Sequence, residues 1–434
     1  MTSPAEDVST PASPRRISRR RRWLFRIVTL LAVAGAQEAL FRVLFPLPEV
    51  LGFNRIHYQQ MAQSHPQIGK AMERGLVYDR LLIDSRPDGF AEVHNLNLYG
   101  FRGPDFRIAP TPGRRRILVI GDSAVEGEGV DDSATITAEW SRLLARDGTA
   151  AEVINLGVIA ASLPHLWILT RDAVALLRPT DVVVALYPND LPAPADERSF
   201  DSPAPRFAPN DEAFRRPRLA VLVDRALYEK PIHRRWPHLP IRFFAPVPDG
   251  TNPWSSKARP DALKDELYQD MKAGRLNPWL YHQSRDMPRL LTHDFAAGGS
   301  PREFLARMEA VCRSVGAGMM VAYTPFCGVV HPRYAPALVE LGMDRDAAAA
   351  LAVDPRFRSQ NRVLAEVCDD LGLPLADATA DLVAAEAAGT PQYWPYDTHP
   401  DARGYATIAR RLHLVWKASR PEASKPSPPP GAAP

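Results

Sequence analysis

The stretch RRRILVIGDSAVEGEG, residues 114–129, decides how this chain folds. Residues 116–120 form a short, largely apolar run rich in β-branched side chains, and the turn Gly121-Asp122-Ser123 follows directly. A short apolar run that ends in a glycine turn is typical of a buried parallel strand. Open α/β sheets place their active crevices at the carboxyl ends of such strands. The stretch therefore predicts Ser123 at the carboxyl end of a central strand, with Asp122 bracing the turn.

The same strand-and-helix alternation continues along the chain. A helix beginning near Ser133 is followed by further predicted elements: strands over 153–156, 181–187 and 319–323, and helices over 166–177, 302–315, 358–371 and 401–417. Alternating strands and helices imply right-handed crossovers and a parallel sheet with helices on both faces. The predicted fold class is thus α/β, a three-layer α/β/α arrangement with a central parallel sheet of the flavodoxin-like kind.

The predicted domain of residues 114–418 is interrupted and flanked by less regular segments. Prolines recur through 191–300, which we interpret as an insertion with one helix around 261–273, and 325–357 is a second irregular insertion. Residues 46–113 have mixed character and lead into the first strand. The segment 419–434 is rich in Pro, Ala and Ser, and its apolar content is too low to fold, which predicts a disordered tail.

The amino-terminal sequence predicts that the chain is targeted to a membrane. Residues 1–22 carry six arginines and are predicted to form a basic cytoplasmic tail, and residues 23–45 are mostly apolar. One alternative is a secretory signal cleaved near the small residues Ala34-Gly35-Ala36. The other, which we favour, is a single-pass anchor, because cleavage would expose the apolar segment 40–45. Either one places the rest of the chain on the periplasmic side of a bacterial inner membrane.

Composition excludes several classes of function. The 434 residues carry 53 basic and 50 acidic side chains, a formal charge of +3, while residues 1–22 alone carry a net +4. The near-neutral remainder offers no electrostatic footprint for nucleic acid. Three scattered cysteines are too few for a disulfide scaffold or a zinc site. We predict no metal and no cofactor.

Candidate catalytic residues lie directly after the predicted strands and just before the last predicted helix. Ser123 follows the first strand, Gly157 the second and Asn189 the third, while Asp397 and His399 lie just before the last helix. A catalytic serine needs a base, a group that orients the base, and donors for the oxyanion. Because parallel strands end at one edge of the sheet, we expect these groups to lie within reach of one another.

Four blocks then resemble those of the SGNH (GDSL-type) hydrolase family, in the same order: GDS at 121–123, NLG at 155–157, ND at 189–190 and DxHP at 397–400. The approach NLYGFR at 97–102 also resembles the lead-in of membrane-anchored bacterial members. The likeness covers roughly residues 95–195 and 300–417.

The resemblance implies one role for each residue. Ser123 would be the nucleophile, with its own N–H in the oxyanion hole. Gly157 would give a second backbone N–H and Asn189 a side-chain amide. His399 would be general base and then acid, and Asp397 would hold the imidazole tautomer.

Two departures from the family pattern stand out. The acid Asp397 lies two residues before His399 rather than three, so a backbone carbonyl is an alternative orienting group. Pro188 stands where the third block usually has glycine, and its fixed φ predicts a differently shaped loop around Asn189.

The expected function is an extracytoplasmic serine esterase that acts on an acylated small molecule or on O-acyl esters of envelope glycans through an acyl-serine intermediate. An O-acyltransferase would use the same site. A non-catalytic carbohydrate-binding or assembly protein that keeps the fold is the third alternative.

Overall fold

The computed structural model describes residues 18–50, 52–62, 80–85, 88–191, 217–220, 241–242, 259–293 and 300–420. The chain forms two compact units. One comprises Met1–Leu47 and Asp211–Leu227, and the other comprises Pro48–Asn210 and Tyr228–Pro434. The larger unit holds the sheet and every candidate site residue.

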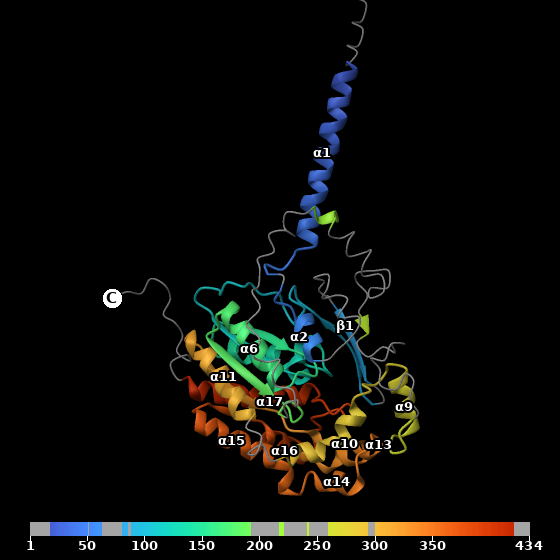
Figure 1. Cartoon of the computed structure of the whole chain (residues 1–434), viewed down its shortest axis with the longest axis vertical. Coiled ribbons are helices and arrows are strands. Elements are labelled where there is room, and N and C mark those ends of the chain that lie inside the picture. Colours follow the sequence, from blue (N-terminus) through green and yellow to red (C-terminus); the bar gives the residue numbers. More distant parts are fainter. Residues whose placement is uncertain are drawn as a thin grey trace, which may run out of the picture. The chain divides into compact units, whose positions relative to one another are not determined.

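A five-stranded sheet, parallel throughout, lies at the centre of the larger unit (Figure 1). In spatial order its strands are β4 (Ala151–Gly157), β3 (Arg115–Gly121), β5 (Asp181–Leu186), β7 (Gly318–Tyr323) and β8 (Leu375–Asp377). The predicted parallel sheet is confirmed, and four of its strands match predicted ones. The short strand β8 was not predicted, because three residues show no measurable period.

The strand order places a crevice beside Ser123. The chain enters at β3, moves outward to β4, and then returns past β3 to add β5, β7 and β8 on the other side. The crossover direction therefore reverses between β3 and β5, and such a switch point is where open α/β sheets bind ligands. Gly121 pairs with Gly157 in register, so the strand ends that precede Ser123 and follow Asn155 lie side by side.

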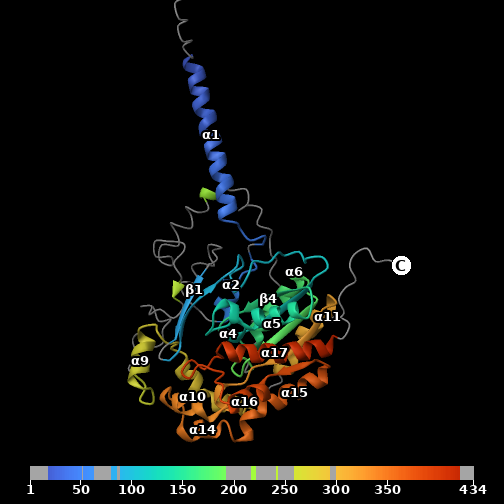
Figure 2. The same cartoon turned by 180° about the vertical axis from the view of Figure 1, so that it is seen from behind.

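Alternate residues of β3 enter two different cores. Leu118 and Ile120 pack on one face of the sheet, and Ile117 and Val119 pack on the other. The first face is covered by α6 (Leu163–Leu177), α11 (Ser300–Ser314) and α15 (Ser359–Leu371). The second is covered by α5 (Ile136–Arg146), α16 (Thr379–Ala387) and α17 (Ala402–Ser419), with α5 against α17 (Figure 2).

The prediction that 325–357 forms an irregular insertion is wrong, because the segment is largely helical. It contains α12 (Cys327–Val330), α13 (Ala335–Glu340) and α14 (Arg345–Ala350), and buried side chains such as Leu338 and Leu351 join the second core. Helices this short carry too few turns for an apolar period to be recognised.

The predicted insertion 191–300 is described in part. Its predicted helix around 261–273 is confirmed as α9 (Asp265–Lys272), and α10 (Leu280–Leu291) follows. Residues 192–216, 221–240, 243–258 and 294–299 lie outside the described residues, as does 421–434 of the predicted tail.

The lead-in segment contributes a second, small sheet that the sequence did not predict. Strands β1 (Arg80–Ser85) and β2 (Phe90–Asn95) pair antiparallel, and β6 (Ile241–Arg242) joins β1 in parallel. The helix α2 (Arg55–Ala62) precedes this sheet. Both elements bring lead-in side chains to the site described below.

The smaller unit contains the helix α1 (Arg19–Leu44), in the place of the predicted segment 23–45 (Figure 1). Its most apolar window has a mean hydropathy of 1.6, and none of that window is buried. By length and composition α1 is able to cross a membrane, and a signal sequence would pass the same test.

Candidate functional site

Three predicted site residues form one hydrogen-bonded chain. The imidazole of His399 lies with Nε2 2.7 Å from Ser123 Oγ and with Nδ1 2.6 Å from Asp397 Oδ1. All three side chains are buried, and Ser123 is 7% exposed. A serine whose hydroxyl meets an imidazole, itself held by a carboxylate, has the geometry of an activated nucleophile. The catalytic roles of the three residues remain predictions.

Backbone geometry explains how an acid two residues before the histidine reaches its ring. Thr398, between Asp397 and His399, has a φ of 69°, in the left-handed region that a β-branched residue rarely adopts. Its N–H donates to the carbonyl of Trp394 at 3.0 Å, which fixes the turn. The side chains of Asp397 and His399 therefore contact each other directly, and the alternative of a backbone carbonyl at Nδ1 is not what the structure has.

A serine from the lead-in segment adds one more hydrogen bond to the series formed by Ser123, His399 and Asp397. Ser85, the last residue of β1, donates its hydroxyl to Asp397 Oδ2 at 2.5 Å, and both groups are buried. The two carboxylate oxygens of Asp397 are thus divided between His399 and Ser85. The sequence reasoning missed Ser85, since a single serine in a segment of mixed character gives no signal of its contact with residue 397.

The nucleophile lies where β3 gives way to the short helix α4 (Ser123–Glu126). Asp122 caps this helix, because its Oδ1 accepts from the N–H of Ala124 at 2.9 Å, as the bracing role predicted. Ser123 occupies the first helical position, where an N–H has no intrahelical acceptor. The same serine Oγ lies 3.2 Å from Asp122 Oδ2, a second and longer contact.

Gly157 packs against the backbone of α4, which begins at Ser123, and the sequence did not predict this close approach. A Cβ at this position would be 2.1 Å from the backbone nitrogen of Glu126, so no side chain fits there. Its N–H donates to Asn155 Oδ1 at 2.9 Å. The oxyanion role that the resemblance implies for Gly157 therefore requires this N–H to be shared with, or released by, Asn155, and it remains a prediction.

Asn189 lies in the turn after β5, at the same edge of the sheet. Its amide Oδ1 is buried and has no hydrogen-bond partner within the described part of the chain. The turn itself is fixed by the next residue, since Asp190 Oδ2 accepts from the N–H of Tyr187 at 2.8 Å. The unpaired atom is the amide oxygen, which accepts hydrogen bonds, whereas an oxyanion would be held by Nδ2. The oxyanion role of Asn189 is likewise a prediction.

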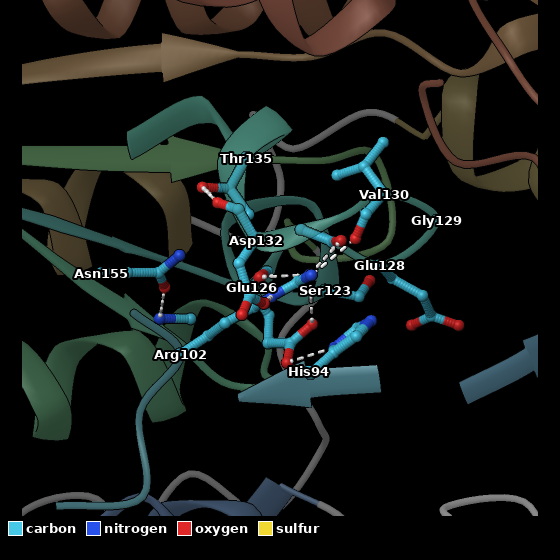
Figure 3. A network of polar contacts seen from close by, with 12 residues as sticks. His94, Arg102, Ser123, Glu126, Glu128, Gly129, Val130, Asp132, Thr135 and Asn155 are labelled. Atoms are coloured by element: carbon cyan, nitrogen blue, oxygen red, sulfur yellow. Dashed lines mark hydrogen bonds and ion pairs between the residues drawn. The ribbon is translucent and has the colours of Figure 1, made fainter. Parts of the chain in front are cut away.

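A buried network of charges fastens the lead-in segment to α4 (Figure 3). Glu126 Oε1 lies 2.8 Å from Nδ1 of His94 and 3.3 Å from a guanidinium nitrogen of Arg55. Burial would raise the pKa of Glu126, but the charges of His94 and Arg55 outweigh it and lower that pKa to about 2. Arg102, from the NLYGFR stretch, donates to the carbonyls of Gly127 and Val130, both at 2.5 Å.

Replacing Glu126 should cost much of the fold's stability. Glu126→Ala leaves the guanidinium of Arg55 and the imidazole of His94 buried without their anion, and we expect a loss of about 3–5 kcal/mol in unfolding free energy. The measurement is urea unfolding of the full-length protein, followed by tryptophan fluorescence. Glu366→Ala is the control, because the Glu366–Arg362 pair is 61% and 67% exposed and should contribute less than about 1 kcal/mol. Equal midpoints for the two variants would contradict the network's role.

Glu128 is a second acid beside the imidazole, and the sequence reasoning missed it. Its Oε2 lies 3.9 Å from His399 Nε2, and neither carboxylate oxygen has a hydrogen-bond partner among the described residues. Figure 3 shows this carboxylate pointing away from the network around Glu126. The sequence signal that was available is an acidic residue five positions after Ser123, flanked by two glycines; acidic side chains are rarely buried without a partner.

The charges around His399 favour its protonated form. Burial lowers the pKa of the imidazole, but the carboxylates of Glu128 and Asp397 oppose this and raise the pKa to about 10. Burial in turn raises the pKa of Glu128 to about 8. The groups that face the imidazole are the hydroxyl of Ser123, the carboxyls of Asp397, Glu128 and Asp122, and the stacked ring of Tyr187.

Asp122 and Asp190 form a buried acid pair beneath the nucleophile. Burial raises the pKa of Asp122, and burial together with the charge of Asp122 raises the pKa of Asp190 well above its ordinary value. Both shifts favour the protonated form of these carboxyl groups, and the shift is the larger for Asp190.

The carboxylates of Glu128 and Asp397 and the ring of His399 offer ligand atoms within 4.8 Å of one another. A divalent cation there would compete with existing contacts, because His399 Nε2 already meets Ser123 and Nδ1 already meets Asp397. The donor set fits a serine-centred relay better than a metal site.

Comparison with known proteins gives a likeness to solved structures only. No family model and no curated protein matches the chain. The solved structures include TesA, at 14% identity and a TM-score of 0.34, covering 70% of this chain and 99% of that one. The lipase/acylhydrolase from Enterococcus faecalis has 14% identity and a TM-score of 0.34, covering 70% and 96%. The acetyl xylan esterase AlAXEase has 11% identity and a TM-score of 0.35, covering 70% and 98%. At these identities and TM-scores the alignments carry no argument about the activity of this chain.

Proposed function

We propose that this protein is a serine esterase that cleaves acyl esters through an acyl-serine intermediate. The observation that carries the proposal is the chain of contacts from Ser123 through His399 to Asp397. It lies at the carboxyl edge of a parallel sheet, beside the switch point between β3 and β5. A binding protein would have no need of a base placed 2.7 Å from a serine hydroxyl.

In the proposed reaction Ser123 Oγ attacks the ester carbonyl while its proton moves to His399 Nε2. Asp397 holds the Nδ1 proton and stabilises the imidazolium that forms. The tetrahedral oxyanion would be held by the N–H of Ser123 and by Asn189, with Gly157 as a third donor. The imidazolium then protonates the leaving alcohol, and a second nucleophile releases the acyl group from Ser123.

The proposed substrates are O-acyl esters of envelope glycans or small acylated molecules, outside the inner membrane. The basis is α1, which supports a membrane anchor or a signal, and the arginine cluster at its amino end. Labelling of engineered single cysteines in intact cells and in permeabilised cells would test the side on which the larger unit lies. Reactivity only after permeabilisation would contradict a periplasmic domain.

The experiment that tests the proposed activity is hydrolysis of p-nitrophenyl acetate by the full-length protein in detergent, with and without an added oligosaccharide. Turnover that requires Ser123 and yields free acetate supports the esterase. Acetate found on the oligosaccharide would instead support the acyltransferase. Absence of any Ser123-dependent turnover or acylation would favour the non-catalytic alternative.

The rate of acylation should rise with pH toward the alkaline range. The pKa of His399 is raised to about 10, so the neutral imidazole that accepts the proton of Ser123 forms only as pH increases through that range. Glu128→Gln removes one of the carboxylates that stabilise the imidazolium and should move the midpoint to lower pH. The measurement is the rate of fluorophosphonate labelling against pH for both proteins. Coincident midpoints would contradict this electrostatic account.

Removing the hydroxyl of Ser85 should slow turnover without affecting substrate binding. Ser85→Ala leaves one oxygen of the buried Asp397 without its donor, and a hydrogen bond to a charged group contributes about 1.5–3 kcal/mol, so we expect kcat to fall roughly tenfold or more at unchanged KM. Ser284→Ala is the matched control, since Ser284 is equally buried and its hydroxyl has no partner among the described residues. Equal kcat values for the two variants would remove Ser85 from the relay.

A further inference from the structure

We propose that Glu128 binds the water molecule that attacks the acyl-serine, which makes the site a hydrolase rather than a transferase. This inference rests on the proposed function and adds a residue to it. Glu128 is completely buried, and neither of its carboxyl oxygens has a hydrogen-bond partner in the part of the chain that the structure describes, which is costly unless the group meets a ligand or water. In the proposed acylation step Glu128 acts only through its charge beside the imidazole, and no atom of the substrate is assigned to it.

The position of Glu128 is fixed by contacts of its backbone. Its N–H donates to the carbonyl of Ser123 at 3.0 Å, and its carbonyl accepts from the hydroxyl of Tyr405 in α17 at 2.9 Å. The next carbonyl, that of Gly129, accepts from the indole of Trp394 at 2.8 Å. The nucleophile turn, the last helix and the catalytic loop thus hold the carboxylate beside the imidazole.

The distance between the two groups suits one bridging water. Oε2 of Glu128 and Nε2 of His399 are 3.9 Å apart, longer than a direct hydrogen bond and short enough for one water to contact both. In the free enzyme Nε2 faces the hydroxyl of Ser123. Once that oxygen carries an acyl group it has no proton to share, and Nε2 becomes available to the water.

Deacylation, in this proposal, begins from the acyl-serine and one bound water. The water gives one hydrogen bond to Nε2 of His399 and the other to the carboxyl of Glu128. Its oxygen attacks the acyl carbon, the bond from that carbon to Oγ of Ser123 breaks, and the proton taken by His399 passes to Oγ. The products are a free carboxylic acid and the serine hydroxyl. An alcohol has only one hydroxyl hydrogen to give, so it would leave Glu128 unpaired, and the site selects water.

The test separates acylation from deacylation in full-length Glu128→Gln. With p-nitrophenyl acetate, the burst of p-nitrophenol reports acylation and the later steady rate reports deacylation. We expect the burst to be retained and the steady rate to fall roughly 10-fold to 100-fold. An acetyl adduct on Ser123 should accumulate in the intact mass. The retained burst also serves as the control for folding.

Other results would overturn the inference. If Glu128 acted only through the pKa of His399, the burst and the steady rate of Glu128→Gln would shift together along the pH axis. If Glu128 had no part in deacylation, both would match the wild type while Ser123-dependent turnover remained, and the proposed function would stand without this inference. Absence of any Ser123-dependent release of p-nitrophenol by the wild type would instead remove the proposed function, and this inference with it.

A second measurement needs no variant. With methanol added to the wild type, the acyl group partitions between acetate and methyl acetate. We expect methanol to capture less of it than its molar share with water, because methanol cannot contact both His399 and Glu128. Capture in proportion to concentration or above it would overturn the inference.

Discussion

Ser123→Ala should abolish turnover of p-nitrophenyl acetate while leaving the fold intact. The hydroxyl is the only group at this position able to form the acyl intermediate, and loss of a nucleophile or of its base lowers kcat by roughly 10⁴-fold to 10⁶-fold. His399→Ala should give a loss of the same order, and the double variant should lose no more than either single one, because the two residues act as a unit.

The measurement is steady-state hydrolysis by the full-length protein, with unfolding curves to verify the fold. The exposed residue Ser133, ten positions further along the chain, provides a matched serine-to-alanine control whose activity should equal that of the wild type. Residual turnover within about tenfold of the wild type in Ser123→Ala would place the chemistry elsewhere.

Asp397→Asn should produce the second largest loss. An amide in place of the carboxylate can present its NH₂ group to Nδ1 of His399, which stabilises the tautomer whose Nε2 carries the proton. That tautomer cannot accept the proton of Ser123, and the expected fall in kcat is up to about 10⁴-fold. Substrate binding is not involved, so KM should change little.

Asp401→Asn is the matched control for this loss. Asp401 lies in the same loop, but its carboxylate caps α17 by accepting from the N–H groups of Arg403 and Gly404, and asparagine caps a helix equally well. Its kcat should stay near that of the wild type. If Asp397→Asn were no slower than Asp401→Asn, the contact between Asp397 and His399 would have no catalytic consequence.

The central sheet could be predicted from sequence because its strands carry strong local patterns. Runs such as VVVAL at 182–186 are apolar throughout, as strands covered on both faces are, and β3 and β4 each end in a glycine where α4 approaches the backbone. Ser123 could be placed for the same reason, since it follows a strand of that sheet, whereas Asp397 and His399 were assigned through the resemblance of the DxHP block.

Ser85 and Glu128 could not be found in this way, because their roles depend on contacts across the fold. Ser85 reaches Asp397 from a hairpin more than three hundred positions earlier. Glu128 meets His399 only because α4 turns back at Gly127, where φ is 91°. The left-handed residue Thr398, which explains the shortened acid-to-histidine spacing, also has no sequence signal of its own.

The most direct test of the account is fluorophosphonate labelling of the full-length protein, with the adduct located by peptide mass spectrometry. We predict one covalent adduct on Ser123 Oγ, formed faster as pH rises and absent from His399→Ala. An unlabelled wild type, or an adduct located on any residue other than Ser123, would contradict it.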